Sequence, residues 1–232
     1  MAGPLAADDS DLVADRPGYG ESASAVEKGH VQIEAGVSWT RAQPGAEIAD
    51  LPEALVRIGV AKSLEVRVLA PDWVRTRSGG SETSGWTDMA LGLKGHVAAG
   101  GNDFSLRGAV YLPTGGPDET EDRLDPEIAT AWSRSLSPEW SLGATVSLHR
   151  FRLLHETFTS PSVSVGRTLG KHLATFLEYG ANLVSGLRPA HKLDNGYTWL
   201  VHGRMQLDVS VGVGLSAVAP DFFVGIGVCR LF

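Results

Sequence analysis

The sequence predicts an all-β protein, a membrane up-and-down antiparallel β-barrel of about 12 strands built by residues 29–232. Three observations predict it. Apolar and polar residues alternate with period two from Gly29 onward, short and long connections take turns, and the chain reaches its last residue, Phe232, within a strand. Period two places successive side chains on opposite faces of a strand. Outer-membrane barrels join their strands by short turns at one rim and longer loops at the other.

The terminal stretch, residues 221–232, organises the rest because a closed barrel pairs its last strand with its first. A C-terminal strand that ends in Phe resembles the terminal signal of bacterial outer-membrane β-barrels. Arg230 departs from that signal, which usually has an apolar residue there, although its long stem can reach a membrane interface. One face of the strand carries Phe222, Val224, Ile226 and Val228, and the other carries the small residues Gly225, Gly227 and Cys229.

The composition agrees with this fold class. The chain has 232 residues, enough for one domain, and no run of about 18 apolar residues that would form a helical membrane span. The mean hydropathy of -0.02 is no argument for solubility, since barrel strands alternate. The net charge of -7 argues against nucleic acid as a partner, because phosphate binding needs clustered Lys and Arg. The single cysteine, Cys229, excludes an internal disulfide.

Residues 1–28 show neither helical nor strand periodicity. The first seven residues lack the basic region and apolar core of a secretory signal. Ala6 and Ala7, followed by acidic residues, are typical of the scar of a cleaved signal. We therefore expect a mature protein of the Gram-negative outer membrane, its signal peptide removed. Two interpretations of residues 1–28 stay open: an irregular N-terminal tail, or a plug in the barrel lumen.

The alternation defines the strands in order. In the first, Val31 and Ile33 form an apolar face that suits lipid, whereas Gln32 and Glu34 form a polar face that suits water. The later strands repeat this pattern, and Pro161 interrupts the eighth. The predicted strands are residues 31–40, 54–60, 65–70, 88–96, 104–112, 128–132, 140–148, 157–167, 173–179, 197–202, 207–215 and 221–232.

The connections alternate in length. A soluble Greek-key sandwich should interrupt this rhythm with a long crossover, so the rhythm favours an up-and-down barrel. The predicted short turns lie at residues 62–64, 98–102, 137–138, 170–171 and 203–204. The predicted long loops include one with Pro44, Gly45 and Pro52, and residues 72–86, 113–125 and 183–195.

Outward aromatic residues gather near the two predicted rims, as in the interfacial girdles of membrane barrels. Each residue alone would fit a protein core equally well, and only the grouping favours a membrane girdle. The short-turn group is Phe104, Trp132, Trp140 and Phe232. The long-loop group is Trp39, Tyr179, Tyr197, Trp199 and Phe222.

The inward face carries charges of both signs. They can pair across strands and satisfy one another in a narrow barrel, or they can form a selectivity lining; both interpretations stay open. A barrel of this size falls between a filled barrel of about eight strands and an open porin of about sixteen, so any passage should be narrow. The predicted lumen-lining residues are Glu34, Arg57, Glu65, Arg67, Asp88, Lys94, His96, Arg107, Glu127, His149, Glu178, His202 and Asp208.

Several segments resemble a known family. Residues 15–22 (Asp-Arg-Pro-Gly-Tyr-Gly-Glu-Ser) and 28–37 are similar to the opening of the outer-membrane transporter family of the phenol meta-cleavage (MetA) pathway. Residues 111–115, 131–133 with 140–143, and 207–208 with 219–225 are similar to its later parts. The resemblance covers nearly everything after Asp15. It implies a barrel and, through aromatic degradation, passage of small hydrophobic molecules. It implies no catalytic residues.

The sequence predicts no enzyme, cofactor or metal site. No Gly-x-Ser-x-Gly elbow occurs, and the hydrolase candidates His149, His155 and Ser160 have no evident orienting acid. His-x-x-x-His spacing on a helix is also missing, which argues against zinc. The loop that carries Asp118, Glu119, Glu121, Asp122 and Asp125 lacks the calcium-loop pattern. It fits a solvated loop, or a loop that holds Ca²⁺ or bridges lipopolysaccharide through divalent ions.

The predicted function is an outer-membrane channel or transporter for small solutes, hydrophobic or aromatic ones among them. Its expected partners are outer-membrane lipid or detergent and the solute, and no nucleic acid. Two alternatives stay open, a structural outer-membrane barrel without transport and a soluble β-sandwich binding module. A fold class alone does not establish transport.

Overall fold

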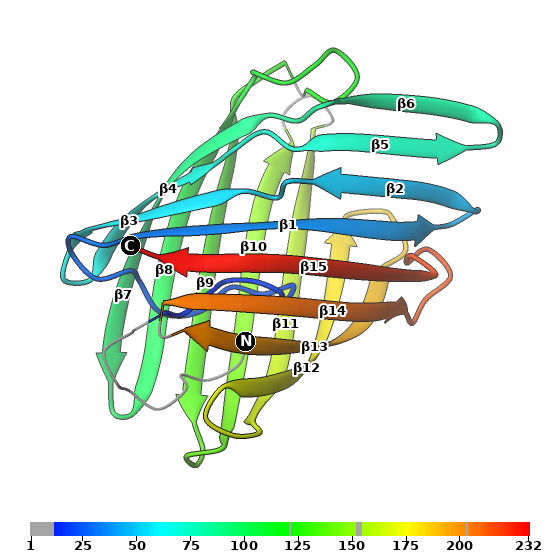
Figure 1. The fold of residues 1–232 in the computed structure, drawn as a ribbon. Helices are drawn as coiled ribbons and strands as arrows, with labels where there is room; N and C mark the ends of the chain where they lie inside the picture. The colour runs from blue at the N-terminus through cyan, green and yellow to red at the C-terminus, as the bar shows by residue number, and fades with distance from the viewer. Residues whose placement is uncertain (1–11, 121, 152–154, 203) are drawn as a thin grey trace.

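The computed structural model describes residues 12–120, 122–151, 155–202 and 204–232. Their strands form one antiparallel sheet, which closes on itself because the last strand pairs with the first (Figure 1). This described part of the chain contains no helix long and apolar enough to cross a membrane. The strands are β1 (Val31–Ala42), β2 (Ala46–Leu51), β3 (Leu55–Ala61), β4 (Leu64–Leu69), β5 (Trp73–Ser78), β6 (Ser81–Trp86), β7 (Met89–Ala99), β8 (Asn102–Leu112), β9 (Asp125–Ser135), β10 (Trp140–Phe151), β11 (Glu156–Thr168), β12 (Leu173–Val184), β13 (Ala190–His202), β14 (Met205–Gly214) and β15 (Phe222–Leu231).

The fifteen segments make a barrel of twelve strands because three barrel strands are interrupted. β2 continues as β3, β4 as β5, and β6 as β7. Pro52 and Pro71 lie at two of these breaks, and proline has no N–H for the ladder. Across the breaks, the Ala70 amide donates to the Ala54 carbonyl (2.9 Å) and the Thr87 amide to the Asp72 carbonyl (2.8 Å). The confirmed barrel therefore has a local interruption in three adjacent strands.

Two predicted loops are wrong in part. The segment around Pro44 and Pro52 contains β2, and residues 72–86 contain the hairpin of β5 and β6, which pair from Trp73 opposite Trp86 to Ser78 opposite Ser81. The hairpin residues are mostly polar on both faces, so hydrophobic alternation is too weak to reveal them. These segments are strands nevertheless, because the backbone of β5 pairs with β2 on one side and with β6 on the other.

Several strand boundaries also differ, and so does the effect of Pro161. β12 reaches Val184 and β13 begins at Ala190, so the predicted loop 183–195 shrinks to residues 185–189. Asp125 belongs to β9 and not to the preceding loop. β11 keeps its register past Pro161, with Thr159 opposite Leu183 and Ser162 opposite Gly180. Proline removes one donor but leaves the extended backbone intact.

The barrel has its charged residues inside and its apolar residues outside. Arg57, Lys94, Glu34 and Glu65 are fully buried. Large apolar side chains point outward and are exposed around the whole circumference, among them Leu93, Leu106, Val146, Val163, Leu177, Val211 and Ile226. A soluble β-sandwich has the opposite distribution, an apolar core between two sheets. The soluble-sandwich alternative is therefore wrong, and the outer surface suits hydrocarbon.

The end of the chain closes the barrel seam. The Phe232 amide donates to the Val31 carbonyl (2.8 Å), and the Val31 amide donates to the Phe232 carbonyl (3.3 Å). β15 pairs with β1 from Leu231 opposite Gln32 to Phe222 opposite Arg41. Because a barrel without this seam exposes two unpaired strand edges, the last pair contributes to closure.

Deleting Phe232 should lower the yield of folded barrel in lipid vesicles more than deleting residues 1–11. The deletion removes both seam hydrogen bonds and an exposed aromatic side chain at the rim. The yield is measured as the heat-modifiable fraction on a gel after assembly into vesicles. Equal yields from the two truncations would show that the final residue has no special part in assembly.

Candidate functional site: the lumen and the segment inside it

Residues 12–28 lie against the inner wall of the barrel (Figure 1, dark blue). We call them the N-terminal segment. Ala23 and Val26 are buried, although the segment has no regular hydrogen bonding of its own. A buried backbone without a ladder needs other partners for its N–H groups.

Three wall carboxylates supply these partners. Glu34 accepts hydrogen bonds from the amides of Asp15 (3.0 Å) and Arg16 (3.0 Å). Glu178 accepts from the amides of Tyr19 (2.6 Å) and Gly20 (2.9 Å), and Glu65 accepts from the amide of Val26 (2.6 Å). Acidic residues on β1, β4 and β12 thus bind one irregular backbone, and their hydrogen bonds are charge-assisted.

Two carboxylates of the segment bind wall cations. Asp15 lies 2.6 Å from Arg67, 3.3 Å from Lys94 and 3.7 Å from Arg57. Burial raises the pKa of Asp15, but Arg57, Lys94 and Arg67 lower it further, so this pKa lies well below its usual value. The carboxyl is therefore ionised and acts as the counter-ion of this cluster.

The second carboxylate is Glu21. Its Oε1 lies 2.5 Å from Arg107 Nε, and its Oε2 lies 3.7 Å from Lys94 Nζ. Arg107 also makes two hydrogen bonds to Glu127, of 2.9 and 3.2 Å. The fork of Arg107 therefore joins the segment to strand β9.

A pair of glycines makes room for Arg16. Gly36 of β1 and Gly227 of β15 lie directly opposite each other, and a Cβ at either position would overlap the Arg16 guanidinium. That guanidinium binds Glu53 (2.5 Å) and Asp208 (3.4 Å). Gly227 of the terminal strand and Gly36 of β1 thus make the space that the Arg16 side chain occupies.

Tyr19 packs against another inward-facing glycine of the wall. Its ring covers Gly180, where a Cβ would lie 2.6 Å from Tyr19 Cδ1. The Tyr19 hydroxyl donates to the side-chain oxygen of Asn182. Lys192 Nζ lies 3.2 Å from the centroid of the Tyr19 ring, which is a cation–π arrangement. The segment is thus attached to β12 and β13 as well as to the wall near β4, β7 and β8.

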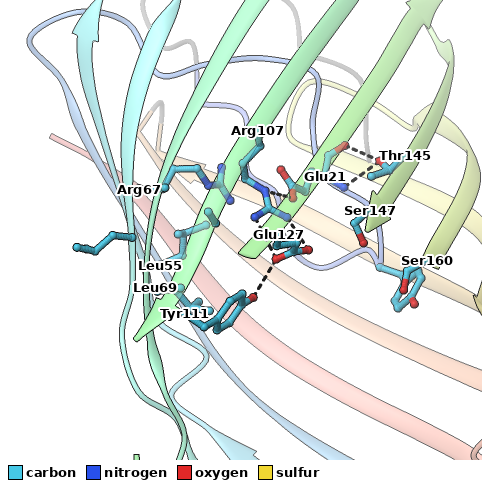
Figure 2. Close-up of a pocket in the computed structure, with 15 residues that line it drawn as sticks. Glu21, Leu55, Arg67, Leu69, Arg107, Tyr111, Glu127, Thr145, Ser147 and Ser160 are labelled. Carbon is cyan, nitrogen blue, oxygen red and sulfur yellow. Dashed lines mark hydrogen bonds and ion pairs between the residues drawn. The ribbon is translucent and has the colours of Figure 1, made fainter. Parts of the chain in front are cut away.

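Two cavities adjoin the segment. One, of about 300 Å³, lies between Tyr19 and Glu21 of the segment and the inner faces of β3, β4 and β7–β11, and Figure 2 shows Arg107, Glu127 and Tyr111 on its wall. The other, of about 390 Å³, is lined by Tyr19, Lys192 and Phe223 among others. Both cavities border the segment and are lined mostly by inward-facing residues of the wall.

Aromatic rings continue along the wall beside the first cavity. Tyr111 donates to Glu127 (3.1 Å) and stacks on His149 at 4.5 Å between ring centroids. His149 stacks on Phe151 at 4.0 Å, and Phe151 meets Phe158 edge to face at 4.7 Å. Since β8, β10 and β11 carry these residues at their long-loop ends, the row leads from the rim toward the cavity.

The structure brings most of the predicted lumen residues into contact with the N-terminal segment. Arg67, Lys94, Arg107 and Asp208 bind its side chains, and Glu34, Glu65 and Glu178 bind its amides. Arg57 donates to its Val13 and Ser24 carbonyls.

The other predicted lumen residues are placed elsewhere. Asp88 accepts from the amides of Thr114 and Gly115, and His96 pairs with Asp103 at the short-turn end (2.9 Å). Glu127 binds Arg107, and His149 stands in the aromatic row. The side chain of His202 lies outside the described residues.

Sequence reasoning missed several residues that line the cavities. Lys192 and Asp194 fell within a predicted loop, but they belong to β13 and line the second cavity. Alternation alone places Tyr111 on the inward face of its strand. Its place in the site follows only from its contacts with Glu127 and His149. Extending the period-two pattern back from Tyr197 would have found Lys192 and Asp194.

The predicted girdle residues are mostly exposed on the outer surface: Phe104, Trp140, Tyr179, Tyr197, Trp199, Phe222 and Phe232. Trp39 packs against Phe222 at 5.1 Å, and Trp132 donates to Asn102 (3.0 Å). The rim predicted for Tyr197 and Trp199 is wrong. β13 begins at Ala190, so these residues lie in its second half, with Trp199 opposite Leu173 near the short turns.

The hydrolase candidates Ser160 and His149 make contacts with other residues. The Ser160 hydroxyl donates to Asn182 (3.0 Å), and His149 is stacked between Tyr111 and Phe151. Within the described ranges, no group of three or more His, Cys, Asp or Glu side chains could hold a metal ion. The chemistry of this lumen, as far as it is described, is ion pairing, hydrogen bonding and aromatic contact.

Known structures share the barrel. The chain superimposes on the COG4313 outer membrane channel from Pseudomonas putida F1 with a TM-score of 0.70 and 13% identity, covering 93% of this chain and 99% of that one. The KdgM porin gives a TM-score of 0.61 at 8% identity, and the NanC porin 0.58 at 6%; each match covers 86% of this chain and 98% of the porin. At these identities the likeness concerns the fold.

Comparison with curated protein sequences gave no match. Residues 14–231 match the family described as "Putative MetA-pathway of phenol degradation", and this range includes nearly all of the barrel and most of the N-terminal segment. The chain therefore belongs to that family.

Proposed function

We propose that the protein is an outer-membrane channel for small solutes, hydrophobic or aromatic ones among them. The observation that carries the proposal is the inverted barrel, with exposed apolar residues outside and buried charges and two cavities inside. The outer surface suits a bilayer, and the lumen is the only route that a polar solute could take across it. The fold shared with outer membrane channels and porins supports the same role.

The aromatic row supports the solute class. Tyr111, His149, Phe151 and Phe158 offer ring faces and edges to a solute that enters from the long-loop rim, and aromatic rings attract one another in stacked and edge-to-face pairs. The description of the family, which refers to phenol degradation, agrees with this class. A solute with one ring fits the volume of about 300 Å³.

Flux measurements distinguish this function from a structural role. Proteoliposomes containing the barrel should take up phenol-sized aromatic solutes faster than sugars of similar size, and replacing Phe151 and Phe158 by Ala should reduce that preference. Equal rates for both solute classes would contradict the solute class. Rates no higher than those of protein-free liposomes would favour a structural barrel without transport.

We also propose that the N-terminal segment is a plug that closes the lumen. Removing the residues before Lys28 should raise single-channel conductance in planar bilayers, because the segment fills the lumen with its own backbone and with Tyr19, Arg16 and Asp15. Identical recordings from the full chain and the shortened chain would show that the segment is a tail that does not close the lumen.

A full-length variant tests the plug without truncation. Gly180→Ala places a methyl group 2.6 Å from the Tyr19 ring, which should displace the segment and increase the open probability. Gly225→Ala is the matched control: it is also an inward glycine of the wall, but its Cβ would meet Ser210 at 3.3 Å and no atom of the segment within 4 Å. Equal open probabilities in the two variants would contradict the plug.

A further inference from the structure

Three wall cations stand next to one another inside the barrel. Lys94 of β7 lies directly opposite Arg107 of β8, and Arg67 lies on the adjacent strand β4, opposite Gly92. Like charges that face each other across a strand pair destabilise a sheet. The arrangement therefore needs anions nearby.

The wall alone supplies too few of these anions. Glu65 binds Arg67 (2.8 Å), but it also binds Arg57 (2.9 Å). Glu127 binds Arg107 (2.9 Å). Lys94 has a fully buried ammonium, and the ion pairs that the described residues give it are both with the N-terminal segment, at Asp15 and Glu21. The Ser22 hydroxyl of the same segment lies 3.4 Å away.

The two carboxylates of the segment supply the missing anions, and each one lies between two neighbouring cations. Asp15 bridges Arg67 and Lys94, at 2.6 and 3.3 Å. Glu21 bridges Lys94 and Arg107, at 3.7 and 2.5 Å. Lys94 is thus shared between two carboxylates, with one arginine on either side. An ammonium without these carboxylates in so buried a site would be strongly unfavourable.

We propose that Arg67, Lys94 and Arg107 form an anion-binding site for a small dicarboxylate, and that Asp15 and Glu21 occupy it as an internal substitute for the solute. A dicarboxylate offers two carboxylates in one molecule, and so it can replace both bridges at once. Its binding and the binding of the segment exclude each other, and the solute thereby favours the open lumen. This inference rests on the proposed channel function and on the segment as its plug.

Two measurements on the full chain test the site, both with potassium succinate as the probe. The first is open probability in planar bilayers. The second is maleimide labelling of Ser24→Cys in a Cys229→Ser background, which reports release of the segment whether or not current flows. Potassium chloride and potassium acetate of equal ionic strength are the controls, because they supply monovalent anions at the same screening.

Succinate should raise both open probability and the labelling rate, whereas chloride and acetate should not. Lys94→Gln should increase labelling without succinate and raise the half-effective succinate concentration about tenfold or more, as expected for the loss of charged hydrogen bonds. Lys94→Arg should restore much of the response. Lys171→Gln, at an exposed turn, should behave as the parent chain.

The two measurements also distinguish a failure of the anion site from a failure of the channel function. If succinate has no more effect than acetate on labelling, or acts equally on the Lys94→Gln variant, the anion site is wrong even when the channel conducts. If labelling responds to succinate but no current is ever seen, the anion site stands and the channel function is wrong.

Discussion

Replacing Val146 by Arg should lower the free energy of unfolding of the barrel in lipid by about 2–4 kcal/mol. Val146 lies in the middle of β10, points outward and is 40% exposed, and its neighbours across the ladders are Pro161 and Thr130. A guanidinium at this depth would lie in hydrocarbon, where nothing replaces its hydration. The measurement is equilibrium unfolding by urea in lipid vesicles, followed by tryptophan fluorescence.

Ser147→Arg is the control, because it places the same side chain one residue further along the same strand. Ser147 faces the lumen and lines the first cavity, where the guanidinium keeps polar neighbours such as Glu127 and Thr145. Its cost should be clearly smaller. Equal destabilisation by the two substitutions would mean that the outward and inward faces of β10 have been assigned wrongly.

Replacing Arg57 by Met should cost about 3–5 kcal/mol of stability, the range for breaking a buried ion pair from one side. The guanidinium of Arg57 holds Glu34 (3.0 Å) and Glu65 (2.9 Å) and donates to the Val13 carbonyl (2.8 Å). Methionine fills a similar volume, so the loss reports the uncompensated carboxylates rather than a cavity. Unfolding in vesicles measures it, and the labelling rate of the N-terminal segment should rise in parallel.

Arg41→Met provides the comparison at a surface ion pair. Arg41 is about half exposed and lies 3.9 Å from Asp221, and exposed pairs contribute only about 0–1 kcal/mol. If Arg57→Met proves as mild as Arg41→Met, the interior cluster does not depend on this arginine, and the lumen is more solvated than its buried side chains indicate.

The strand pattern and the facing of the residues could be read from the sequence. Alternation in segments such as 140–148 has one physical cause, the two-residue repeat of an extended chain between lipid and a polar interior. It predicted the closed barrel and the inward position of Arg57, Lys94 and Glu178. The pattern fails where neither face is apolar, as in β5 and β6, because no burial difference then marks the strand.

Only the tertiary structure decided what the inward charges do. Alternation places Lys94 inside the barrel, but its ion-pair partners come from the N-terminal segment, more than seventy positions away in the chain. The contacts of Arg16 with Gly36 and Gly227, and of Tyr19 with Gly180, likewise join segments far apart in sequence. Local periodicity predicts which face of the sheet a side chain occupies, because the face depends only on the residue's position along its own strand. Which partner it meets across the lumen depends on the closure of the barrel, so it could be read only from the folded chain.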